Sequence, residues 1–291
     1  MKTMLLAAMA VMVAPILLAA PTNSQAQETV MLERAPLAAQ IGEREVSFVA
    51  HDLESGILYV LEGSDLDERH APWSTFKIPN FLIALETGVI SDMDTVTAWD
   101  PSRRPAQNWW PDSWRQDQSL RTAFQRSAVW FFRDIAQELE TQTYRDILAD
   151  WNYGTNDIAE GSDNFWLNQG LEISANEQIA FLEQLQRQEL YLDGQRVSAV
   201  TLEALYEASL ARQINQTGLH GKTGGGTVIP GDFSGPFDGW YVGFVQRQDA
   251  LPVVFALYSQ GPDFRSIRTF RQDFATQLLI EAELLPAAFG E

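Results

Sequence analysis

The chain has 291 residues, of which 45% are apolar and 20% charged, a composition typical of a soluble protein with one large domain or two interleaved lobes. Acidic residues outnumber basic ones by 39 to 20, and this excess argues against nucleic acid or an anionic membrane as a partner. The absence of cysteine excludes a disulfide framework and a lipid anchor on an N-terminal cysteine.

Residues 1–26 are predicted to be a secretory signal peptide. Lys2 precedes an apolar run over residues 4–19, and small residues stand three and one before a cut after Ala26. A membrane anchor is the alternative, but the run is short for a span and lacks a stop-transfer flank. No Arg-Arg pair precedes it, which favours Sec export. We expect a periplasmic or secreted protein that is not attached to a membrane after cleavage.

The mature chain is predicted to begin and end with strands. Alternating patterns over 45–51 and 57–62 predict a β-hairpin around Gly56. Helical spacing covers 74–87, closing at Gly88, and resumes after an irregular, tryptophan-containing stretch over 120–125, 130–140, 144–151, 176–188 and 200–212. Gly-rich turns from Lys222 lead into strands over 239–246 and 252–259 and a final helix over 269–285.

This order predicts an α/β fold of the α+β-like kind, formed by residues 27–291 as a single catalytic domain. One central antiparallel sheet is built from both terminal segments, about 27–70 and 213–291, and is flanked by helices. An all-helical lobe, about 71–212, is inserted between them.

Lysine is scarce: apart from Lys2, the chain contains only Lys77 and Lys222, against seventeen arginines. An amine can lose its proton when it is desolvated and act as a base or nucleophile, whereas a guanidinium cannot. The retention of two lysines therefore suggests positions that need amine chemistry, the alternative being compositional bias.

Lys77 ends the motif Ser74-Thr75-Phe76-Lys77. On a helix, residues three apart share a face, so the serine hydroxyl and the amine can meet, and a helix N-terminus stabilises developing negative charge. Alone the motif is weak, because a helix cap with a surface lysine has the same pattern.

Lys222 begins Lys222-Thr223-Gly224, followed by Gly225. A glycine-rich strand edge lets a ligand approach the backbone and offers N–H groups to an oxyanion. A phosphate-binding loop is excluded because Gln216 stands where that loop needs glycine.

The third motif is Ser127-Ala128-Val129, which lies between two helical stretches. A second serine near the first can relay a proton to a leaving nitrogen. Together the three motifs resemble those of the penicillin-recognising serine enzymes. Val129, where the class A enzymes and peptidases usually carry Asn, resembles the Ser-x-Val of class D (OXA-type) β-lactamases.

The resemblance extends over essentially the whole mature chain. Residues 74–90, 165–167 and 239–243 are similar to class D segments, as are Trp114 and Arg271. It implies hydrolysis of β-lactam antibiotics without a metal or organic cofactor, but with CO2 or bicarbonate to carbamylate Lys77 into N6-carboxylysine. One departure is Thr155, where the family has Asn. In addition, Arg265 and Arg268 lie close to Arg271 and are alternatives for the carboxylate-binding arginine; Arg271 is favoured because Arg271-Gln272 opens the final helix at the family's distance from the C-terminus.

The resemblance also implies a role for each residue. Ser74 is the nucleophile, Lys77 the general base, and Ser127 with Lys222 the proton relay. The backbone N–H groups of Ser74 and Gly225 form the oxyanion hole. The substrate is expected to contact Thr223, Gly224, Arg271 and Trp114, and the carbamate to contact Val129 and Trp166.

Two alternatives to this interpretation remain. A β-lactam sensor domain shares the fold but does not turn over, and a D-alanyl-D-alanine peptidase or penicillin-binding protein acts on cell wall. A metallo-β-lactamase is excluded because His51, His70 and His220 are scattered and no cysteine helps. The expected partner is a small β-lactam, and the protein is expected to be a monomer or homodimer.

Overall fold

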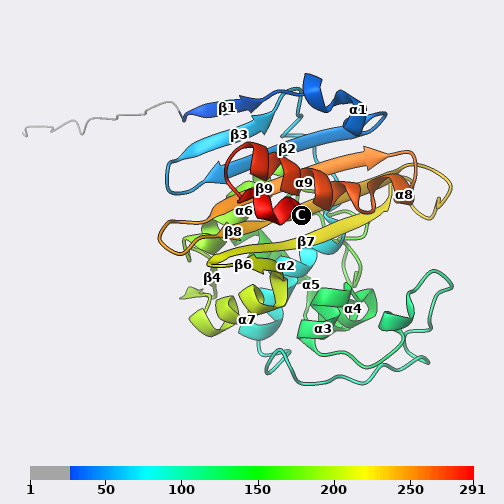
Figure 1. The fold of residues 1–291 in the computed structure, drawn as a ribbon. Helices are drawn as coiled ribbons and strands as arrows, with labels where there is room; N and C mark the ends of the chain where they lie inside the picture. Colours follow the sequence, from blue (N-terminus) through cyan, green and yellow to red (C-terminus); the bar gives the residue numbers. More distant parts are fainter. Residues whose placement is uncertain (1–26) are drawn as a thin grey trace, which may run out of the picture.

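The computed structural model describes residues 27–291; the predicted signal peptide lies outside them. Seven strands form one sheet in the order β1-β3-β2-β9-β8-β7-β6 (Figure 1). The strands are β1 (Thr29–Leu32), β2 (Glu45–Asp52), β3 (Ile57–Leu61), β6 (Leu210–Ile214), β7 (Thr217–Thr227), β8 (Phe237–Gln246) and β9 (Val253–Gly261). N-terminal β2 lies directly beside C-terminal β9, which confirms a sheet built from both ends of the chain.

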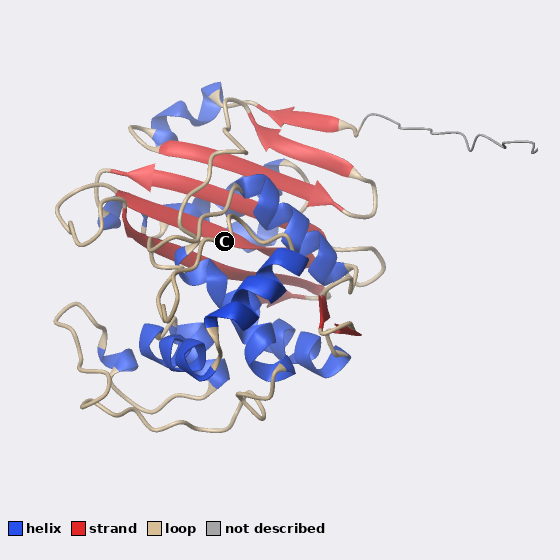
Figure 2. Cartoon of the chain, turned by 180° about the vertical axis from the view of Figure 1, so that it is seen from behind, coloured by secondary structure: helices blue, strands red, loops and turns tan. Residues whose placement is uncertain are grey.

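The helices cover both faces of the sheet and extend beyond one side of it (Figure 2). They are α1 (Ala38–Ile41), α2 (Lys77–Glu86), α3 (Leu120–Arg126), α4 (Val129–Glu138), α5 (Thr141–Asp150), α6 (Ala175–Gln186), α7 (Ala199–Ser209), α8 (Phe264–Ile267) and α9 (Phe270–Glu281). Helix α9 packs on β8 and β9, and α6 packs on β2 and β9. Side chains alternate between the two faces of the sheet, so the sheet has an apolar core on each face. One core contains residues of α6 and the other contains residues of α9.

Several predictions of local structure are confirmed. The hairpin of β2 and β3 pairs Val49 with Val60, and α2 is followed by Gly88 with φ +74°, a left-handed conformation that ends helices. Helices α3 and α6 begin at the capping boxes of Ser119 and Ser174, which satisfy N–H groups of the first turn.

Other predictions need correction. The expected helix over 200–212 ends at Ser209, because the chain from Leu210 pairs with β7 as strand β6. The last helix ends at Glu281 rather than at residue 285. The sheet is not wholly antiparallel, since edge strand β1 runs parallel to β3. Strand β1 and the small hairpin of β4 (Tyr191–Leu192) and β5 (Gln195–Arg196) were not predicted.

Candidate active site

The Ser-x-x-Lys motif spans two helical forms. Ser74 lies in a 3-10 turn, η2 (Trp73–Phe76), and Lys77 begins α2, with Pro79 in its first turn, where a missing N–H costs nothing. The Thr75 hydroxyl donates to Pro72 O at 2.7 Å and accepts from Gln178 of α6 at 3.1 Å. These contacts fix the turn that presents Ser74.

Lys77 is fully buried, and its Nζ donates to Ser74 Oγ at 2.8 Å. Burial lowers the pKa of this amine well below its ordinary value, and the positive charge of Lys222 lowers it further. Val129, at the start of α4, is buried nearby in the helical core, and the Phe132 ring centroid lies 5.2 Å from Nζ. The site therefore favours a neutral amine in contact with the serine hydroxyl.

Ser127 joins α3 to α4 in a left-handed conformation, with φ +59°. Non-glycine residues adopt this region rarely, and such strain gathers at functional sites. Its Oγ accepts from Lys222 Nζ at 3.1 Å. Burial lowers the pKa of Lys222 to about 7, with a further contribution from the charge of Arg271.

The three motifs meet where β7 passes η2. Strand β6 pairs with β7 only as far as His220, so within residues 27–291 the stretch from Gly221 to Thr227 pairs with β8 alone. A Cβ on Gly224 would lie 2.7 Å from Pro72 O, so glycine is what allows this close approach.

Side chains alternate along β7, so Lys222 and Thr223 lie on opposite faces of the strand. Gly224 faces η2, whereas a Cβ on Gly225 would lie 2.5 Å from Arg271 Nη1. A ligand that contacts both Lys222 and Thr223 must therefore lie along the edge of the strand rather than on one face.

Of the three candidate arginines, Arg271 lies at this strand. It is buried on α9, and its Nη1 donates to Gly224 O at 2.6 Å, whereas Arg265 and Arg268 are exposed. Burial lowers the pKa of Arg271 to about 10, and Arg268 contributes to this shift.

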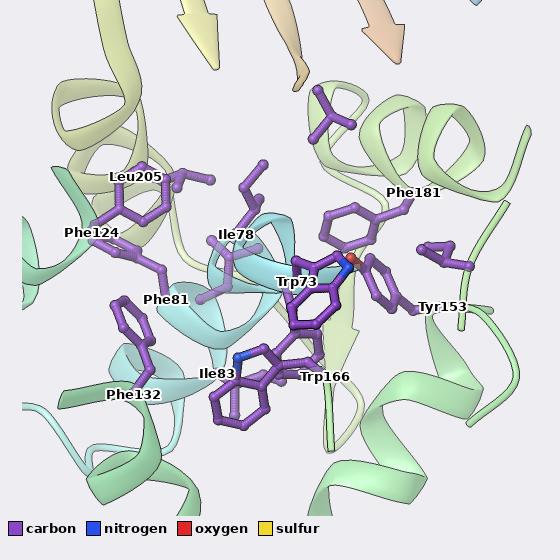
Figure 3. Packing of buried hydrophobic residues seen from close by; sticks show 14 of the residues in the cluster. Trp73, Ile78, Phe81, Ile83, Phe124, Phe132, Tyr153, Trp166, Phe181 and Leu205 are labelled. Atoms are coloured by element: carbon purple, nitrogen blue, oxygen red, sulfur yellow. The ribbon is translucent and has the colours of Figure 1, made fainter. Parts of the chain in front are cut away.

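Tryptophans border the site on the helical side (Figure 3 shows Trp73 and Trp166 in the core). Trp166 is fully buried against Phe76, and its indole N–H has no hydrogen-bond partner among the described residues. Trp114 is buried and donates to Arg126 O at 2.7 Å. Trp109 is half exposed and lies 6.2 Å, centroid to centroid, from Phe233 in the β7–β8 loop.

The structure also shows the surroundings of Thr155 and of the three histidines. Thr155 Oγ1 accepts from the N–H of Glu172 at 3.0 Å and donates to Gly170 O at 3.3 Å. Threonine therefore forms hydrogen bonds with the backbone of this loop at the position where class D enzymes have asparagine. His51 contacts Glu183, His70 stacks on Tyr258 and His220 stacks on Phe244. The three histidines therefore have separate, packed environments.

Sequence reasoning missed Trp73 and Asp238. Trp73 precedes the serine with φ +51°, and its Nε1 donates to Asp238 Oδ2 of β8 at 3.2 Å. No local pattern around Asp238 predicts this contact, because the hydrogen bond joins residues 165 positions apart.

Comparison with known proteins agrees with this geometry. The family described as penicillin binding protein transpeptidase domain matches residues 46–278. The chain therefore belongs to this family.

Among curated relatives, "Beta-lactamase OXA-11" of Pseudomonas aeruginosa is 34% identical over 73% of this chain and 74% of its own length. "Probable beta-lactamase YbxI" of Bacillus subtilis is 32% identical over 69% and 70%. The crystal structure of a class D beta-lactamase from Sebaldella termitidis has a TM-score of 0.74 at 27% identity, covering 89% of this chain and 98% of that one. Within the family, the chain is a serine β-lactamase of class D.

Proposed function

We propose that the protein hydrolyses the β-lactam ring of penicillin-type antibiotics through an acyl-enzyme on Ser74 and so confers resistance. The observation that carries the proposal is the 2.8 Å contact between Ser74 Oγ and the buried amine of Lys77. A buried, neutral-leaning amine beside a hydroxyl is the arrangement that activates a serine nucleophile.

In this proposal the general base at Lys77 takes the proton of the Ser74 hydroxyl, Ser74 Oγ attacks the lactam carbonyl carbon, and the ring C–N bond breaks. The backbone N–H groups of Ser74 and Gly225 hold the oxyanion. Ser127, which lies 3.1 Å from Lys222 Nζ, delivers a proton to the departing nitrogen. A water then attacks the ester carbonyl and releases Ser74.

The substrate carboxylate is assigned to Lys222, Thr223 and Arg271, whose side chains lie on the two faces of β7 at the edge that is unpaired within residues 27–291. Trp114 is assigned to the border of the pocket for the substrate side chain. Thr223 and Arg271 share one face of the strand, which supports a joint role.

The residues around Lys77 fit a carbamylated lysine. Trp166 holds a buried N–H without a partner among residues 27–291, and an unpaired buried donor is costly unless an acceptor arrives. Val129 and Phe132 keep the amine dry, which favours the neutral form that adds CO2. Such a carbamate supplies a carboxylate-like general base for acylation and hydrolysis.

Hydrolysis of a chromogenic cephalosporin, with and without added bicarbonate, tests the function. We expect sustained turnover that bicarbonate raises. A single stoichiometric burst would instead indicate a sensor; one relative, "Regulatory protein BlaR1" of Bacillus licheniformis, is 30% identical over 75% of this chain and 34% of its own length. Turnover of a D-alanyl-D-alanine peptide but not of the cephalosporin would indicate a peptidase.

The substitution Lys77→Arg keeps a cation but cannot form the carbamate or a neutral amine. We expect kcat to fall by about 10²–10⁴-fold, the usual contribution of a general base. Stopped-flow and steady-state hydrolysis at saturating bicarbonate measure it. Turnover at the wild-type rate in this variant would contradict the mechanism.

Export is proposed from the sequence of residues 1–26. Cleavage after Ala26 leaves all of β1, which begins at Thr29 and pairs with β3. Mass spectrometry of the protein from a periplasmic extract is expected to give Gln27 as the first residue. Within the described part of the chain, no helix has the length and apolar character needed to span a bilayer.

A further inference from the structure

The residue before the nucleophile has a backbone conformation that its own side chain disfavours. Trp73 has φ +51°, in the left-handed region that bulky side chains avoid. Such a conformation persists only where the surroundings hold it in place, and it is often found at functional sites. Because Trp73 and Ser74 share a peptide bond, whatever holds Trp73 also sets the direction of the Ser74 main chain.

Three contacts hold Trp73. Its backbone N–H donates to Trp166 O at 3.0 Å. Its ring presses on β7, where a Cβ on Gly226 would lie 2.2–2.4 Å from three ring carbons. Its Nε1 donates to Asp238 Oδ2 at 3.2 Å, and of the three contacts this is the one in which a side chain accepts the hydrogen bond.

Asp238 is a buried carboxylate with three neutral donors. It is 5% exposed, and besides the indole it accepts from Tyr258 OH at 2.8 Å and from Gln260 Nε2 at 3.4 Å. An ionised carboxylate only accepts hydrogen bonds, so this set of donors matches it. Burial and then the charge of Asp238 raise the pKa of Tyr258, which keeps the phenol protonated and donating.

We propose that Asp238 is a positioning residue for the nucleophile. Its carboxylate fixes the Trp73 indole, the indole fixes the left-handed backbone at Trp73, and that backbone orients the hydroxyl and N–H of Ser74. Asp238 does not touch the substrate. The proposal rests on Ser74 being the acylated residue, as proposed above.

Two substitutions at this position separate its roles. Asp238→Asn keeps one oxygen to accept from Trp73, and its NH2 group can donate to Tyr258, whose hydroxyl can rotate. Asp238→Leu keeps the volume but removes both acceptors. The rate constant of acylation by a fluorescent penicillin is the measurement. We expect it to fall about ten-fold or more in Asp238→Leu and to stay within about three-fold in Asp238→Asn, because small misplacements of reacting groups are costly to rate.

Tyr258→Phe is the matched control, because it removes another donor to the same carboxylate without freeing the indole. We expect it to lower the melting temperature and to leave the acylation rate constant unchanged. Trp73→Phe removes the indole donor and should slow acylation as Asp238→Leu does. In the Trp73→Phe background, Asp238→Leu should slow acylation no further, since both act through one contact.

Equal slowing by Tyr258→Phe, or additive effects at Trp73 and Asp238, would overturn the proposal and indicate general loss of packing. If Asp238→Leu does not fold, Trp73→Phe against Tyr258→Phe makes the same distinction. A wild-type protein that neither hydrolyses the penicillin nor forms a covalent adduct with it would refute the acyl-enzyme on Ser74 instead.

Discussion

The two amines of the site, Lys77 and Lys222, belong to buried residues, with 0% and 5% of their surface exposed. Each ammonium is disfavoured by burial, and the charge of Lys222 lowers the pKa of Lys77. The scarcity of lysine in the sequence marked both residues as candidates for amine chemistry. The Phe132 ring lies beside Lys77 and the Phe124 ring beside Lys222, and both rings come from other helices, so only the fold shows how the pKa values of the amines are lowered.

The pKa of Lys222, about 7 in the folded protein against an ordinary value of 10.5, predicts how stability depends on pH. Between these values the unfolded chain binds the extra proton, so the free energy of unfolding rises with pH, by up to about 1.4 kcal/mol per unit for this group. Below pH 7 the buried amine is protonated in the folded protein as well, so the full destabilisation from burying this charge is present.

Lys222→Met should remove this contribution. Urea unfolding at pH 7, 8 and 9 is expected to show a steeper rise of the unfolding free energy for the wild type than for the variant. Parallel pH profiles for the two proteins would contradict a depressed pKa at Lys222.

Among the elements, the contact between β7 and the η2 turn decides the geometry of the site. The glycines of β7 were predicted to let a ligand approach, and the structure adds that they let the turn approach. Gly224 faces Pro72, Gly225 faces Arg271 and Gly226 faces the Trp73 ring.

Gly224→Ala tests this contact, because its Cβ would lie 2.7 Å from Pro72 O and 3.2 Å from the Thr75 nitrogen. Both are backbone atoms, so the strand and the turn must separate. We expect a loss of about 1–3 kcal/mol of stability, as for other overpacked sites, and a larger relative loss of acylation rate.

The control for Gly224→Ala is Gly194→Ala in the β4–β5 turn, where a Cβ meets nothing within 4 Å but φ is +74°. Its backbone strain should lower the melting temperature without slowing acylation. Equal acylation rates in the two variants would show that the η2 contact is not needed for catalysis.

Across the molecule, an ion-pair network joins the long segment after α2 to the segment that carries Trp166. Buried Asp163 contacts Arg104 Nη2 at 2.9 Å and Arg133 Nη2 at 2.7 Å, and it accepts from Gln137 Nε2 at 2.9 Å. Arg104 is itself only 8% exposed. Asp163 stands three residues before Trp166, so the network anchors the segment that carries Trp166.

Asp163→Ala should lower the free energy of unfolding by about 1.5–3 kcal/mol, because it removes charged hydrogen bonds to Arg104 and Arg133, although Arg104 keeps its pair with Asp134. Asp94→Ala is the control: it breaks a surface pair with Arg121 and should change stability little. Chemical denaturation of both variants measures the difference. Similar small effects would show that the network is solvated.

The sequence by itself determined the enzyme class and the fold class. Three short motifs with Val129 indicated the family, and hydrophobic periodicity located the hairpin of β2 and β3 and helices α2 to α6, because these signals are local. It failed at β6 and at β1, where pairing with a distant strand overrides local preference.

Only the tertiary structure decided which side chains tune the site. Spacing favoured Arg271 but left Arg265 and Arg268 as alternatives, because only the packing of α9 on the sheet shows which of them reaches Gly224. The contact of Trp73 with Asp238 was likewise invisible, since it joins two elements far apart in sequence. Burial, and with it every pKa shift in the site, is a property of the assembled core rather than of any motif.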